Sequence, residues 1–74
     1  MSNGSLYKAM IIGYLGADYS FISKSYKWCY YQALHFAKQA LYLHDHIDDI
    51  IIELSDGVNI IVDRAGYVVI RGRV

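Results

Sequence analysis

The segment HDHIDD, residues 44–49, holds the densest set of metal-ligating residue types in the sequence. Imidazole and carboxylate groups are ordinary ligands of zinc and manganese. In an extended segment, His44 and His46 would project to the same side. Sequence spacing places no third ligand, however, and the aspartates equally fit a polar segment leaving a helix. We therefore expect no metal site and no cofactor, with metal or ligand binding through His44 and His46 as an alternative.

Cys29 and His35 are the residues that could supply a thiol nucleophile and its base. At their spacing on a helix the two side chains point in different directions, which favours Cys29 as a small buried hydrophobe. The sequence contains no Ser-His-Asp order, no glycine-rich phosphate loop and no paired-cysteine motif. We predict no catalytic residues and a protein that is not an enzyme.

Basic residues gather toward the C-terminus, where Arg64, Arg71 and Arg73 could combine with Lys8 and Tyr67 into a basic sheet face. Sheets that carry basic and aromatic side chains bind nucleic acids. The formal net charge is zero, from seven basic and seven acidic residues, which is a weak footprint for a polyanion binder. Nucleic-acid binding through the last strand is therefore an alternative. The plainer interpretation is that Arg71 and Arg73 protect an edge strand from further pairing.

Hydrophobic periodicity and turn residues predict five strands and one helix in the order ββαβββ. The strands are expected at 6–15, 19–22, 49–54, 58–63 and 67–74, the helix at 25–43, and the turns at 16–18, 55–57 and 64–66. Short turns make the first hairpin and the final three strands antiparallel. The predicted fold is a single α+β domain over residues 1–74, with residues 1–5 frayed. It is a two-layer sandwich, an antiparallel five-stranded sheet packed on one helix, whose strand order the sequence leaves open.

Alternation within the strands predicts which side chains face the helix. The expected core positions are Ile50, Ile52, Leu54, Val58, Ile60, Val62, Val68, Ile70 and Val74. The reverse side of the sheet is expected to show Ile51, Glu53, Asn59, Ile61, Asp63, Tyr67, Val69, Arg71 and Arg73. Gly13 inside the first strand predicts a bulge. Ser23 and Ser25 both qualify as the helix N-cap, because a serine hydroxyl accepts a bond from a free helix amide.

The predicted helix is apolar on more than one face. At 100° per residue, the core-facing stripe contains Tyr26, Tyr30, Ala33, Leu34, Ala37, Ala40, Leu41 and His44. The opposite face, which should be charged, carries Trp28, Tyr31, His35, Gln39, Tyr42 and His46. Either another part of the chain covers this second stripe or a partner does. A domain of 74 residues has little chain left for that purpose, which favours a partner.

The apolar content supports the same expectation. Hydrophobic residues make up 55% of the chain, more than a monomer of this size easily hides, and oligomerisation would bury the surplus. We predict a non-enzymatic protein-binding module that forms a homodimer, binds another protein, or does both. The candidate contacts are Trp28, Tyr31, His35 and Tyr42 on the helix, and Tyr67, Arg71 and Arg73 on the last strand.

The cysteine count and the apolar runs predict the compartment. Cys29 is the only cysteine, so no intrachain disulfide can form, and a small domain without disulfides fits a reducing cytosol. The apolar run 9–15 is too short to span a membrane. We expect a cytoplasmic protein with no membrane partner.

The layout of three segments resembles several small phage-encoded anti-CRISPR proteins. These segments are YKAMIIGYL, the helix YKWCYYQALHFAKQA, and DIIIELSDGVNIIVDRAGYVVIRGRV. The likeness covers nearly the whole chain and is architectural, so it assigns no role to any residue. It implies an inhibitor of a bacterial defence complex that acts by occluding a protein surface, in the host cell cytoplasm if a phage encodes it.

Overall fold

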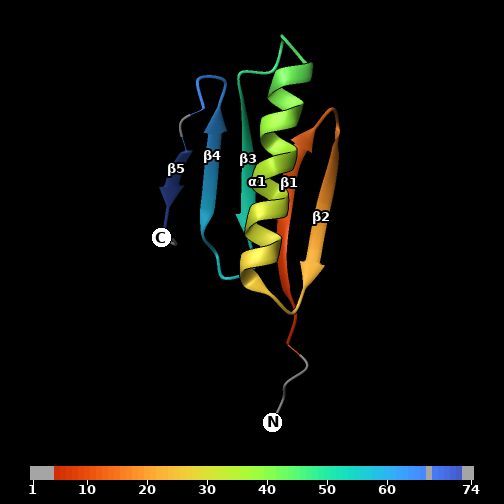
Figure 1. Cartoon of the computed structure of the whole chain (residues 1–74), viewed down its shortest axis with the longest axis vertical. Coiled ribbons are helices and arrows are strands. Elements are labelled where there is room, and N and C mark those ends of the chain that lie inside the picture. The colour runs from red at the N-terminus through yellow and green to blue at the C-terminus, as the bar shows by residue number, and fades with distance from the viewer. Residues whose placement is uncertain (1–4, 67, 73–74) are drawn as a thin grey trace.

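The computed structural model describes residues 5–66 and 68–72 as one helix packed on one sheet (Figure 1). The elements are β1 (Tyr7–Tyr14), β2 (Ala17–Ser23), α1 (Tyr26–Leu43), β3 (Asp49–Leu54), β4 (Asn59–Asp63) and β5 (Val68–Arg71). The strands form a five-stranded antiparallel sheet in the order β2-β1-β3-β4-β5. This architecture confirms the predicted two-layer α+β fold. It also supplies the strand order: β1 pairs with both β2 and β3, which joins the first hairpin to the last three strands.

The first hairpin differs from its prediction. Its turn consists of Leu15 and Gly16, with Tyr14 paired to Ala17, so β2 begins earlier than the predicted residue 19. Leu15 and Gly16 have φ values of 50° and 81°, and positive φ at both central residues is the signature of a type I′ turn. This turn matches the right-handed twist of its strands, so two residues suffice and the turn predicted at 16–18 is wrong.

The bulge predicted at Gly13 is confirmed. The pairing of β1 with β2 shifts register between Ile11 and Tyr14, and Gly13 has a φ of 67°. Its amide donates a hydrogen bond of 2.8 Å to Oδ1 of Asp18. Asp18, expected in the turn, therefore lies on β2 and holds the bulge in place.

Leu15 is the one described non-glycine residue with positive φ, and that conformation costs a branched side chain roughly 1 kcal/mol. Asparagine tolerates this region, and Asn-Gly is a preferred type I′ sequence. We expect Leu15→Asn to raise the free energy of unfolding by about 0.5–1 kcal/mol, measured by urea denaturation. Leu15→Ala is the matched control, since alanine keeps the conformational penalty. An equal gain in both variants would assign the effect to loss of the exposed leucine side chain instead.

Side chains cap both ends of α1. The hydroxyl of Ser25 accepts the amide of Trp28 at 3.1 Å, which makes Ser25 the N-cap, while Ser23 accepts the amide of Ser25. No glycine ends the helix. Instead, the Arg64 guanidinium from the β4–β5 turn donates to the carbonyls of Leu41, His44 and Ile47. Arg64 thereby ties the helix exit to the far hairpin.

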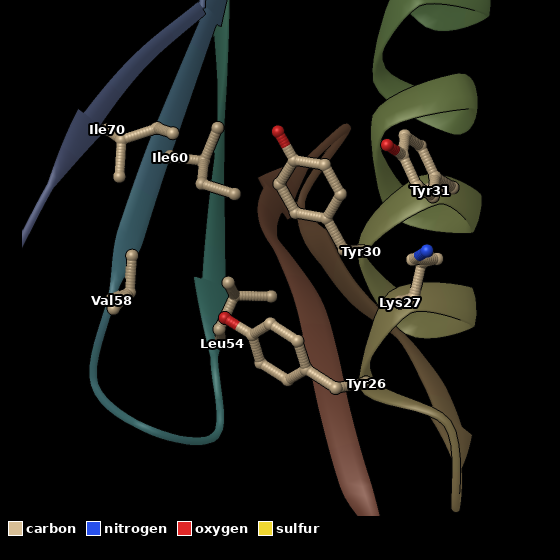
Figure 2. Close-up of a pocket in the computed structure, with 8 residues that line it drawn as sticks. All are labelled: Tyr26, Lys27, Tyr30, Tyr31, Leu54, Val58, Ile60 and Ile70. Atoms are coloured by element: carbon tan, nitrogen blue, oxygen red, sulfur yellow. The ribbon is translucent and has the colours of Figure 1, made fainter.

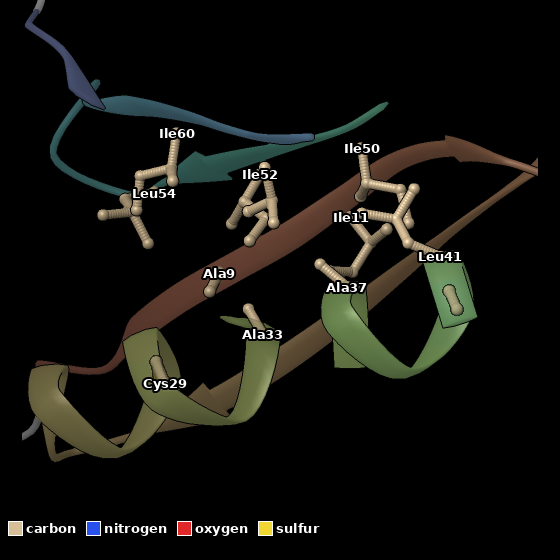
Figure 3. Close-up of a cluster of buried hydrophobic side chains, with 12 residues drawn as sticks. Ala9, Ile11, Cys29, Ala33, Ala37, Leu41, Ile50, Ile52, Leu54 and Ile60 are labelled. Atoms are coloured by element: carbon tan, nitrogen blue, oxygen red, sulfur yellow. The ribbon is translucent and has the colours of Figure 1, made fainter. Parts of the chain in front are cut away.

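The core lies between α1 and the inner face of β1, β3 and β4 (Figure 3). The buried residues are Ala9, Ile11, Cys29, Ala33, Ala37, Ala40, Leu41, Ile50, Ile52, Leu54, Ile60 and Val62. Small residues on both elements, Ala9 on β1 and Ala33 and Ala37 on α1, let helix and sheet approach closely, and the isoleucines fill the space around them.

Three of the predicted core positions on the inner face are not buried. Val58 and Val68 are half-buried, and Ile70 is 60% exposed; Val74 lies outside the described residues. The physical reason is the position of α1, which contacts β1, β2, β3 and β4 but does not reach the described residues of β5. Burial of Ile70 was therefore a wrong prediction, although its orientation was right.

Candidate functional site

An open apolar groove lies between α1 and the β4–β5 side of the sheet (Figure 2). Its volume is about 290 Å³, and it is lined by Tyr26, Lys27, Tyr30, Tyr31, Leu54, Val58, Ile60 and Ile70. We call this surface the helix–sheet groove. It exists because α1 lies over the β1 side of the sheet and leaves β5 uncovered.

Tyrosines form the helix side of the groove. The rings of Tyr30 and Tyr31 pack edge to face with centroids 5.1 Å apart. Tyr26 packs on Tyr7 at 5.4 Å, and its hydroxyl donates to Oδ2 of Asp56 at 3.1 Å. Partial burial, followed by the neighbouring Asp56 carboxylate, raises the pKa of Tyr26, so its hydroxyl stays protonated and donating at neutral pH. Rings held in this way offer large contact area and polar tips at little entropic cost.

Ile70 is the residue that most distinguishes the groove from ordinary surface. It pairs across the sheet with Ile60, which is 1% exposed, whereas Ile70 is 60% exposed on the same face. The buried core therefore continues into the groove without a polar boundary at this point. An apolar group bound against Ile70 would extend the core by one strand.

The charge along the groove is positive on the helix side. Residues 26–43 contain Lys27 and Lys38 and no aspartate or glutamate. Lys27 lines the groove, and Lys38 lines a second hollow on the same side of α1 with Leu41, Tyr42, Asp63 and Arg64. The opposite formal charges of Asp63 and Arg64 cancel, so the residues that line this hollow have a net positive charge from Lys38.

The structure divides the helix residues that the sequence singled out. Trp28 packs against Phe21 of β2 with ring centroids 6.3 Å apart, on the flank of α1 away from the groove. Tyr31 lines the groove, and Tyr42 lines the second hollow while remaining 83% exposed. His35 is exposed. The predicted second stripe is thus exposed, but its aromatic side chains face two directions.

Among the strand residues of the predicted site, Arg71 is the one that the structure describes. Arg71 is exposed and pairs with Asn59, on the face opposite α1, while Tyr67 and Arg73 lie outside the described residues. Sequence reasoning missed Tyr26, Tyr30 and Ile70 as site residues because it placed them in the core. The available signal was sheet width, since one helix does not cover five strands.

The face of the sheet away from α1 carries an apolar row of its own. Register places Ile12, Ile51, Ile61 and Val69 side by side across β1, β3, β4 and β5. Val69 is 48% exposed, and a polar row containing Glu53 and Arg71 runs beside it. We call this surface the open sheet face. It is a second place where apolar area remains uncovered.

The structure places the histidines and the cysteine that could have supplied metal or thiol chemistry. His44 and His46 rings lie 5.7 Å apart, but among residues 5–66 and 68–72 no group of three or more His, Cys, Asp or Glu residues could hold a metal ion. The Cys29 thiol is fully buried and hydrogen-bonded to the carbonyl of Tyr7, so it meets no substrate from solvent.

Within the part of the chain that the structure describes, no helix combines the length and apolar character needed to cross a membrane. The chain matches no protein-family model, no curated protein sequence and no solved structure.

Proposed function

We propose that the protein is a non-enzymatic protein-binding module and that the helix–sheet groove is its binding site. The observation that carries this proposal is the exposure of Ile70 on the sheet side of a groove whose helix side carries three tyrosines. Apolar anchors surrounded by Tyr side chains are typical of the energetically dominant centre of protein interfaces. A partner side chain placed here would bury area next to an existing core.

The chemistry of the groove favours a protein over a nucleic acid. A nucleic-acid site needs several cations on one surface to meet phosphates. The Arg64 guanidinium is occupied by three backbone carbonyls, and Arg71 lies on the face opposite the groove. Lys27 is the one cation among the residues that line the groove, so the groove has no cluster of cations to meet phosphates.

The resemblance to anti-CRISPR proteins makes this function more specific. We propose that the module occludes a surface of a bacterial defence complex in the cytoplasm, where the Cys29 thiol stays reduced. Self-association remains a prediction, and the open sheet face is the surface that would carry it. The two surfaces can be tested separately because they lie on opposite sides of β5.

The adjacent residues Ile70 and Val69 make a matched pair for this test, since both are exposed on β5 and point to opposite faces. We expect Ile70→Asp to weaken binding of a co-expressed defence-complex subunit by at least tenfold, because a carboxylate would be desolvated in the interface. Val69→Asp should leave that binding intact and lower self-association, measured by sedimentation velocity across concentration. Circular dichroism of both variants should match that of the wild type, which is the control for folding. Equal partner binding by wild type and Ile70→Asp would reject the groove as the site.

A further inference from the structure

We propose that the occupant of the helix–sheet groove is an amphipathic helix with acidic residues along one edge, supplied by the partner protein. It would lie beside α1 on β4 and β5 as a second helix of the same layer. This inference rests on the proposed function, because it names the kind of partner that the groove binds.

The dimensions of the sheet provide the space. Five strands about 4.8 Å apart make a sheet roughly 24 Å wide, whereas a helix with its side chains is about 10 Å across. α1 contacts β1, β2, β3 and β4 but does not reach the described residues of β5, so this edge of the sheet is uncovered (Figure 1). The layer therefore has room for two helices and contains one. A sheet of this width is ordinarily covered by packing a further element on its apolar face.

The floor and wall of the groove suit the apolar stripe of such a helix. Ile70 and Val58 come from the sheet side, and the Tyr30 ring extends from α1 toward Ile60 (Figure 2). Val68, half-buried on the same face as Ile70, continues the floor along β5. Helices recognised in grooves bind through residues at i, i+3 or i+4, and i+7, which form one continuous apolar line.

The two lysines of α1 favour a partner helix that carries negative charge. Lys27 and Lys38 are eleven residues apart, which puts them about 16 Å apart along α1 and within roughly 20° of the same direction. A neighbouring helix with carboxylates on the edge facing α1 would meet both ammonium groups. The α1 of a second copy would bring the same lysines and no carboxylate. Like charges at close approach disfavour that occupant.

Two synthetic peptides test this inference directly. Both are 18-residue helix-forming sequences with the same leucine stripe; one carries glutamates along one edge, and the other carries lysines there. We expect the fluorescein-labelled glutamate peptide to bind at least tenfold more tightly at low salt by fluorescence anisotropy, with the difference shrinking at 0.5 M salt. Its helical circular dichroism signal should increase on binding. Ile70→Asp should abolish binding of the glutamate peptide, and Val69→Asp should not.

Reversing the charge of the two lysines on the protein tests whether they select the peptide. The double variant Lys27→Glu/Lys38→Glu should reverse the preference so that the lysine peptide binds more tightly, whereas Arg71→Glu on the open sheet face should leave it unchanged. An unchanged preference in the double variant, equal binding of both peptides, or binding without gain of helix would overturn the inference; the last result would indicate strand addition at β5.

The inference and the proposed function fail in different ways. If neither peptide binds but Ile70→Asp still releases the co-expressed protein partner, the groove is a protein site and an acidic helix is not its ligand. If Ile70→Asp instead converts a dimer into a monomer by sedimentation, the occupant is a second copy. If Ile70→Asp changes none of these measurements, both proposals are rejected.

Discussion

Replacing Ile52 by alanine is expected to lower the free energy of unfolding by about 2–5 kcal/mol. Ile52 is fully buried on the central strand β3, where it pairs with Ile11 on one side and Ile60 on the other. Removing its outer carbons leaves a cavity that rigid neighbouring strands cannot fill. Because domains of this size have small stability margins, Ile52→Ala should unfold at markedly lower urea concentration, followed by far-ultraviolet circular dichroism.

Ile51→Ala is the matched control, since Ile51 precedes Ile52 on β3 and is 40% exposed on the open sheet face. In a monomer its loss should cost less than about 1 kcal/mol. A large cost at Ile51 that disappears on dilution would mean that a second copy covers the open sheet face. A large cost that is independent of concentration would contradict the assignment of this face as surface.

Replacing Arg64 by alanine is expected to lower the free energy of unfolding by about 2–3 kcal/mol, because a charged donor to several acceptors is lost. The guanidinium donates to the carbonyl of Leu41 in the last turn of α1 and to those of His44 and Ile47 just after it, where no glycine terminates the helix. Without the guanidinium, the carbonyls of Leu41 and Ile47 depend on water, and the side-chain connection from the end of α1 to the β4–β5 turn is lost. Urea denaturation measures the total effect, and amide exchange in residues 40–47 reports local opening.

Two variants separate the geometry of Arg64 from its charge. Arg64→Lys retains the charge but cannot reproduce the planar fork, so it should recover only part of the stability. Arg71→Ala removes an exposed arginine from β5 and should change stability by less than about 0.5 kcal/mol. Equal losses in Arg64→Ala and Arg71→Ala would indicate a general effect of net charge in place of the specific bonds.

Local pattern was enough to predict most of the elements. The β-branched run at 49–54 matches β3 residue for residue, because β-branched residues favour a strand and the turn residues 55–57 define its C-terminal end. The helix prediction differs from α1 only at its first residue, where Ser25 caps the helix without joining it. The position of the first turn was predicted wrongly because Leu15 is an unfavourable residue for positive φ. In the structure Leu15 nevertheless adopts positive φ, since the hairpin favours a two-residue loop.

Contacts between residues far apart in the sequence could not be predicted from local sequence pattern. The bonds from Arg64 to the end of α1 join residues 17 to 23 positions apart, and no spacing rule predicts them. The exposure of Trp28 and Tyr42 was predictable because the helical period puts them opposite the alanine stripe. The different directions of Trp28 and Tyr31 depend on which strands lie on each side of α1.

The sequence by itself determined that this chain forms one helix and five strands with more apolar surface than they can bury, because residue type and period are local properties. Only the tertiary structure decided where that surplus lies. Pairing of β1 with β3 places β5 at the edge farthest from β2, and α1 follows β2 directly through a short connection. The helix consequently packs over the β1 side, and Ile70, which alternation directs toward the core, becomes the exposed floor of the helix–sheet groove.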